Sequence, residues 1–142
     1  MEQRKLQTIV IFFNSKIKKG GLFAPFFLGG EMEITYDDFK KVQIKIGTVL
    51  SVEKNEKARK PSLVLKVDFG KEIGIKQSSA QITHYYSKEN LTGKQVIGVC
   101  NFPKKNIAGV ISEVLILGAI EKDGKVILVH PSQKAENGLD IA

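Results

Sequence analysis

The sequence has little of what metal, disulfide or membrane chemistry needs. Of 142 residues, one is cysteine, two are histidine and none is tryptophan. A single cysteine, Cys100, excludes an internal disulfide and a cysteine-based zinc site, and His84 and His130 lie too far apart in sequence to form a zinc signature. No apolar run approaches the ~20 residues that a membrane-spanning helix requires. We therefore expect a protein of a reducing cytoplasm, with no membrane span, no metal and no cofactor.

Motifs of the common catalytic chemistries are also missing. Gly118 and Gly124 are separated by five residues, and the lysine after Gly124 is not followed by serine or threonine, so they make no phosphate-binding loop. No G-x-S-x-G nucleophile elbow occurs. Ser112 and Glu113 are neighbours in a predicted strand and therefore point to opposite faces. We expect no enzymatic activity.

Positive charge is what the chain has in excess. Lysine and arginine number 22 against 15 aspartate and glutamate residues, which gives a formal net charge of +7. Such an excess favours polyanionic partners without indicating a fold. With 42% apolar and 26% charged residues, the chain is typical of one domain with a hydrophobic core and not of a disordered protein.

Residues 1–31 differ in composition from the rest of the chain. They hold five basic residues against two acidic ones, and five of the eight phenylalanines. They lack the long apolar core and the cleavage site of a secretory signal. Two explanations fit this segment: it is a disordered extension, or it is translated upstream sequence before a true start at Met32, where Gly29-Gly30-Glu31 requires a purine-rich run that resembles a ribosome-binding site. On either explanation the folded domain comprises residues 32–142.

From Met32 onward the pattern becomes regular. Residues 35–41 have an N-terminal threonine, acids in the first turn and lysines in the last, which predicts a short helix. Alternating and apolar stretches predict strands over residues 44–52, 62–69, 72–76, 95–101, 112–120 and 126–129. In the first of these the residues expected on one face are Ile44, Ile46, Thr48, Leu50 and Val52. In the second they are Leu63, Leu65, Val67 and Phe69.

Two further signals complete the predicted fold. Ser78, with Gln81 three residues later, fits a capping box that would open a second short helix reaching Tyr85 or Tyr86. Residues 101–109 are a loop by composition, and Asp123-Gly124 predicts a hairpin turn. The fold class is therefore mainly β: a five- or six-stranded barrel of the oligonucleotide/oligosaccharide-binding (OB) type, with a short N-terminal helix and an inserted short helix.

Three basic and polar groups are candidates for ligand binding. One lies where a strand would end and the inserted helix would begin, a place where free backbone N–H groups favour an anion. Another lies in the loop after the next strand, and the third between the first two strands, where this class of barrel contacts ligands. In order, the groups are Lys76, Ser78 and Ser79; Asn101, Lys104 and Lys105; and Arg59 and Lys60. The alternative is ordinary: a helix cap and solvated surface lysines.

Tyr85 and Tyr86 leave three interpretations open: the adjacent tyrosines could stack on bases, pack on a partner chain, or pack within the protein with the hydroxyl exposed.

Two segments resemble the tRNA-binding domain found at the C-terminus of some methionyl-tRNA synthetases and in multisynthetase-complex proteins. Residues 38–49 read D-F-x-K-V-x-I-x-I-G-T-V, and residues 101–113 read N-F-P-K-K-x-x-x-G-x-x-S-E. The second segment adds Ser112 to the candidate site residues. Within this family, residues 67–83 resemble the CsaA-type export chaperones. Where many members have Ser-Glu-Gly-Met, this chain has Val114 in place of the glycine, which weakens the expectation of high-affinity tRNA binding.

The resemblance implies an OB barrel, a homodimer and no catalytic activity. It implies two alternative functions. The first is a chaperone that binds unfolded or precursor polypeptides in connection with protein export, with the export machinery as a further partner. The second is a free-standing tRNA-binding protein that acts in trans.

Overall fold

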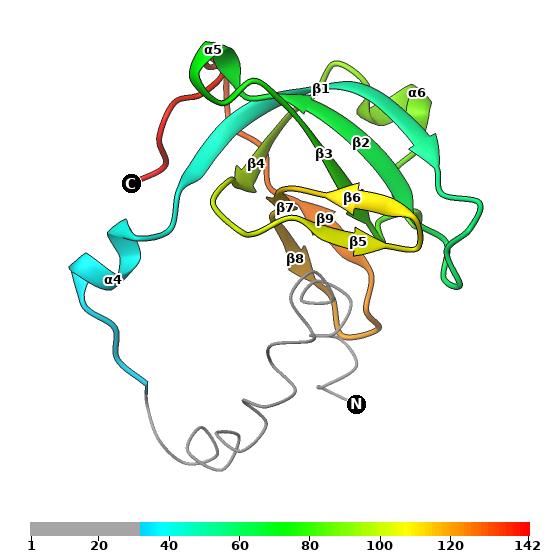
Figure 1. Ribbon diagram of the computed structural model, residues 1–142, viewed down its shortest axis with the longest axis horizontal. Coiled ribbons are helices and arrows are strands. Elements are labelled where there is room, and N and C mark those ends of the chain that lie inside the picture. Colours follow the sequence, from blue (N-terminus) through cyan, green and yellow to red (C-terminus); the bar gives the residue numbers. More distant parts are fainter. Residues whose placement is uncertain (1–31) are drawn as a thin grey trace.

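The computed structural model describes residues 32–142, which form one barrel with an N-terminal arm (Figure 1). The leader, residues 1–31, lies outside the described residues. The helices are α4 (Tyr36–Lys40), α5 (Gly70–Ile73) and α6 (Lys88–Leu91). The strands are β1 (Ile44–Lys54), β2 (Leu63–Asp68), β3 (Ile75–Ala80), β4 (Gln95–Val99), β5 (Lys105–Ile107), β6 (Val110–Ser112), β7 (Leu115–Ile116), β8 (Gly118–Ile120) and β9 (Val126–Leu128). Between residues 32 and 142, no helix has the length and apolar content needed to cross a membrane.

Five antiparallel strands in the order β3-β2-β1-β4-β7 make the main sheet, and β5–β6 and β8–β9 are hairpins. The end of β6 and the residue that follows it form hydrogen bonds with the edge strand β3. Ser79 N donates to Ser112 Oγ over 3.1 Å, and Glu113 N donates to Gln77 O over 2.8 Å. These contacts nearly close the sheet, which confirms the predicted mainly-β barrel of OB type.

Strand β1 is long, and each half has a different partner. Its first half pairs with β4 and its second half with β2, and a bulge interrupts the second register between Val49 and Ser51. The extra residue of a bulge shifts the in–out alternation. Leu50 is therefore 45% exposed, while Val49 and Val52 are buried. The prediction that Ile46, Thr48 and Leu50 share one face with Val52 was wrong for this reason, because Gly47 and Val49 face the core in the first half of the strand.

The core lies inside the barrel, and the predicted strand with the clearest alternation contributes four residues to it. Leu63, Leu65, Val67 and Phe69 are all buried, as predicted. Buried side chains from the other elements complete the core: Val49, Val52, Ile82, Leu91, Val96, Val114, Ile116, Val126 and Leu128. Burial of this apolar surface is the main force that holds the barrel together.

The C-terminal residues 138–141 lie along the first half of β1, where β2 is absent. Three backbone hydrogen bonds of 2.8–3.1 Å join this tail to Ile44 and Ile46. Beside them, Lys45 Nζ and Asp140 Oδ1 form an ion pair at 2.7 Å. The hydrogen bond to Asp140 raises the pKa of Lys45. The tail thus supplies the hydrogen bonds that β2 supplies further along the strand.

The inserted helix was predicted at the wrong place. Residues 75–80 form β3, and α6 begins only at Lys88, behind a capping box made by Ser87 and Asn90. Ser78 is buried in the strand, and its hydroxyl donates to Val114 O over 2.9 Å. Pairing with β2 and with the chain after β6 therefore overrides the local capping pattern, which an isolated segment would follow.

Several other boundaries differ from the predicted ones. The predicted strand 72–76 is α5 followed by the start of β3, which leaves Ile75 58% exposed. The predicted loop 101–109 contains β5, and the predicted strand 112–120 is divided among β6, β7 and β8. The N-terminal helix is confirmed as α4, with a capping box between Thr35 and Asp38. The hairpin turn at Gly124 is also confirmed, because this residue joins β8 to β9 with a φ of +90°.

Candidate binding surfaces

A basic face covers the outer side of β2, β3 and β6. A hollow of about 360 Å³ opens there, lined by Lys66, Ile75, Lys76, Gln77, Ile111 and Glu113. Lys104 reaches the same place, because its Nζ lies 3.5 Å from Glu113 Oε1. Lys105 pairs with Ser112 in the adjoining hairpin. The structure therefore brings together the predicted residues Lys76 and Lys104, whereas Lys105 lies opposite the buried Ser112 and so shares the other face of the hairpin from Ile111. We use the term basic face for Lys104 and the residues that line the hollow.

Glu113 organises the basic face. Its Oε2 accepts the backbone N–H of Gln77 at 3.0 Å, while Oε1 pairs with Lys104. It is the one acid among the residues that line this hollow. One carboxylate against several lysines leaves a net positive surface, which attracts a polyanion from solution.

The serines predicted to bind a ligand are structural. The hydroxyls of Ser78 and Ser112 are buried, and each is engaged: Ser78 donates to Val114 O, and Ser112 accepts from Ser79 N. A helix N-terminus that would offer free N–H groups is absent from this place, since Ser78 and Ser79 lie within β3. The prediction of an anion site at a helix start is therefore wrong. Ser78 and Ser112 instead form hydrogen bonds between β3 and residues 112–114.

Asn101 is likewise engaged within the fold. Its Oδ1 accepts from Gln43 N at 2.9 Å, and its Nδ2 donates to Lys41 O over 2.7 Å. These bonds fix the arm that carries α4 to the barrel. Val114, which replaces a glycine of the family pattern, points into the core with no exposed surface, so its side chain adds no bulk to the basic face.

Arg59 and Lys60 lie apart from the basic face, in the exposed loop 55–62 between β1 and β2. This loop meets the tip of the β5–β6 hairpin, since the Cδ of Lys57 would lie 3.6 Å from a Cβ placed on Gly109. Lys104 and Lys105 are at the other end of the same hairpin. The three predicted groups thus follow one hairpin without converging on one point.

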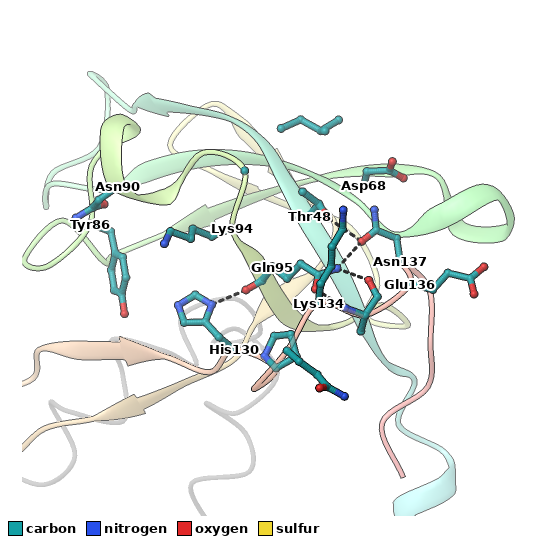
Figure 2. Close-up of a pocket in the computed structure, with 15 residues that line it drawn as sticks. Thr48, Asp68, Tyr86, Asn90, Lys94, Gln95, His130, Lys134, Glu136 and Asn137 are labelled. Atoms are coloured by element: carbon teal, nitrogen blue, oxygen red, sulfur yellow. Dashed lines mark hydrogen bonds between the residues drawn. The ribbon is translucent and has the colours of Figure 1, made fainter.

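A second surface has no counterpart in the sequence patterns. A hollow of about 1050 Å³ lies between β1, the turn before β4 and the segment 130–137 (Figure 2). Its floor is held by hydrogen bonds from Thr48 Oγ1 to Asn137 Oδ1 at 2.7 Å, and between Gln95 and the backbone of Ala135 at 2.6 and 2.9 Å. His130 Nδ1 lies against the carbonyl oxygen of Gln95. Segment 130–137 has no alternation of apolar residues, so nothing in the sequence pointed to it.

Figure 2 shows Lys94 projecting between Tyr86 and His130. Tyr86 packs against the core, and its hydroxyl accepts from Leu128 N at 2.8 Å, which settles the open interpretation of this residue in favour of packing. Tyr85 is 42% exposed and donates its hydroxyl to Glu121. That hydrogen bond raises the pKa of Tyr85.

Metal and thiol chemistry have no basis in the described part of the chain. Residues 32–142 contain no cluster of three or more His, Cys, Asp or Glu side chains arranged to hold a metal ion. Cys100 follows β4 and packs against the core, and burial raises the pKa of its thiol to about 11. It stays protonated at neutral pH and is therefore a poor nucleophile.

Comparison with known proteins accounts for the fold and the two signature segments. The chain is 40% identical over 109 residues to the methionine–tRNA ligase of Chlorobium limicola, an alignment that covers 77% of this chain and 15% of the ligase. The chain thus corresponds to a small part of the curated relatives it matches.

Two solved structures correspond over their whole length. The chaperone CsaA from Bacillus anthracis superposes with a TM-score of 0.74 at 44% identity, and the CsaA chaperone protein from Picrophilus torridus with 0.73 at 49%. Each comparison covers 78% of this chain and 100% of the other. Residues 44–140, which span the barrel from the first residue of β1 to the C-terminal tail, match the family model described as "Putative tRNA binding domain". The chain therefore belongs to the tRNA-binding domain family.

Proposed function

We propose that this chain is a non-catalytic, CsaA-like molecular chaperone that binds unfolded or precursor polypeptides in the cytoplasm in connection with protein export. The observation that carries the proposal is the correspondence over the full length of two proteins named as CsaA chaperones, against 15% of the methionine–tRNA ligase. The export machinery is the expected further partner.

An exposed apolar side chain beside lysines supports this function physically. Leu50 is 45% exposed and lines a hollow that also contains Lys94 and Lys134. Unfolded polypeptides expose apolar side chains together with charges of both signs. Charged groups accelerate encounter with such a chain, and apolar contacts prolong the complex once it has formed.

The proposal includes a homodimer. In the arm before β1, the side chains of Met32, Ile34, Tyr36 and Val42 are exposed, and α4 has no buried residue. Apolar side chains presented on one short element favour association with a second surface. Light scattering and sedimentation would give twice the monomer mass if a second copy covers them.

The chaperone function is tested by dilution of a chemically unfolded client, such as citrate synthase, into buffer with the protein and without ATP. We expect light scattering to be suppressed at a near-stoichiometric ratio, because holding requires binding alone. A protein of similar net charge without a chaperone function, such as lysozyme, serves as the control for non-specific effects. Unchanged aggregation at a large excess of the chain would rule the function out.

Binding of tRNA in trans is the second candidate, and the basic face favours it. Each phosphate contact contributes about 0.7–0.9 to the slope of log binding constant against log salt concentration. Replacing Lys104 and Lys105 by alanine should therefore lower that slope by about 1.4–1.8 if both contact phosphate. Lys71→Ala with Lys122→Ala, at two exposed lysines outside the basic face, is the matched control. An identical slope in the two double variants would place tRNA elsewhere.

A further inference from the structure

A groove runs around α6, on another side of the barrel from the basic face. One part is the hollow of Figure 2; the other, of about 900 Å³, lies between the loop 55–62 and α6. Tyr86 lines both parts, so the two hollows adjoin at this residue. Neither part shares a lining residue with the hollow of the basic face. In Figure 1 the β1–β2 ribbon separates α6 from the β5–β6 hairpin. We call these two joined hollows the α6 groove.

The charges of the α6 groove are balanced, unlike those of the basic face. Its lining contains five lysine and arginine residues and five aspartate and glutamate residues. A nucleic acid laid along it would place phosphates against five carboxylates, and like charges disfavour such a complex. An unfolded polypeptide carries both signs and can match both. The charge distribution of the α6 groove therefore favours an unfolded polypeptide over a nucleic acid.

The part of the groove between the loop 55–62 and α6 carries most of these charges. Glu53, Glu56 and Glu89 line it together with Lys54, Arg59 and Lys88. An extended polypeptide with side chains of both signs can pair with both sets.

The other part of the groove offers apolar contact and free cations. Leu50, which the β-bulge turns outward, lines it beside Lys94 and Lys134. Within residues 32–142 neither lysine forms an ion pair. An extended amphipathic segment would bury an apolar side chain on Leu50 and set its acidic side chains near these ammonium groups.

From these observations we infer that the α6 groove is the binding site for an extended segment of unfolded polypeptide, distinct from the basic face, which the second candidate function assigns to tRNA. The inference rests on the proposed chaperone function and names its site. It has one direct consequence: a tRNA on the basic face does not exclude a polypeptide from the groove.

The first experiment is competition. The binding of a fluorescently labelled, permanently unfolded polypeptide with equal numbers of acidic and basic residues is followed by anisotropy. We expect saturating unlabelled tRNA to leave the polypeptide bound, with less than a twofold change in its dissociation constant. Competitive displacement by tRNA would overturn the inference.

Matched variants locate the two sites. Leu50→Ser combined with Lys94→Ala should weaken polypeptide binding at least tenfold and leave the tRNA affinity within twofold, which also shows that the variant is folded. Lys76→Glu combined with Lys104→Glu should do the reverse. The inference fails if Lys76→Glu with Lys104→Glu abolishes polypeptide binding and Leu50→Ser with Lys94→Ala does not. If the wild-type chain binds no unfolded polypeptide at all, the proposed function itself fails.

Discussion

At the scale of single residues, two glycines allow the C-terminal tail to pass close to α5. Gly138 has a φ of +93°, and a Cβ there would lie 2.7 Å from Phe69 O. Gly70 faces it with a φ of +88° and the same distance to Asn137 O. A side chain at either position meets both backbone strain and a carbonyl that cannot move away, so the two glycines are required by the packing of two segments that are distant in sequence.

Gly138→Ala should lower the free energy of unfolding by about 2–4 kcal/mol, because a left-handed conformation and a close contact are added together. Gly124→Ala is the matched control: its φ is +90°, but nothing lies within 4 Å of the added Cβ. Strain alone should cost about 1–2 kcal/mol there. Urea unfolding measures both, and equal losses would mean that the contact with Phe69 relaxes freely.

Cys100 should be nearly inert to alkylation. Its pKa of about 11, against an ordinary value of 9.0, keeps the thiolate fraction low, so iodoacetamide should react roughly 100-fold more slowly than with an exposed cysteine near pH 8. Because the folded pKa is raised, this group's contribution to stability is complete below pH 9.0 and is lost as pH rises toward about 11. Mass spectrometry gives the rate, and rapid labelling of the folded protein at pH 8 would contradict the prediction.

At the scale of elements, the sequence predicts what is local. Leu63, Leu65 and Val67 alternate over a short run, and one face of β2 is buried accordingly. Ser78 illustrates the opposite case, because its role depends on Val114, 36 positions away. A capping pattern depends only on residues close in sequence, so it predicted a helix start at Ser78.

The candidate sites show the same contrast between features that are local in sequence and features formed by distant segments. The lysines of the basic face could be found from composition and from the family resemblance, although Glu113, which holds Lys104 and Gln77, could not be assigned that role. The α6 groove could not be predicted. It is formed by three separate segments, and Leu50 points into it only because a bulge shifts the alternation of β1.

Asn101→Ala should release the arm that carries α4. Two hydrogen bonds are lost together, one that Asn101 accepts from Gln43 N and one that it donates to Lys41 O, at a cost of about 1–3 kcal/mol. Hydrogen exchange should become faster over residues 36–43 and stay unchanged in β2. Asn106→Ala removes a single bond from Gly109 N and serves as the control. Equal protection of the arm in both variants would show that other contacts hold it.

At the scale of the whole molecule, the C-terminal tail completes the sheet. Deletion of residues 138–142 removes three backbone hydrogen bonds and the Lys45–Asp140 pair, so the free energy of unfolding should fall by about 2–4 kcal/mol. Asp140→Asn removes only the partly exposed ion pair and should cost less than about 1 kcal/mol. Thermal unfolding compares the two, and a truncated chain as stable as the full one would show that the tail merely rests on β1.

The bond between Ile141 N and Ile44 O, at 2.9 Å, has a consequence beyond stability. The start of β1 and the C-terminal tail are neighbours, so a sequence joined before or after the barrel is attached at the same place on its surface. A longer protein can therefore contain this barrel as a separate domain, and the order of its strands does not have to change. That geometry accounts for how one architecture serves both as the full length of small chaperones and as 15% of a tRNA ligase.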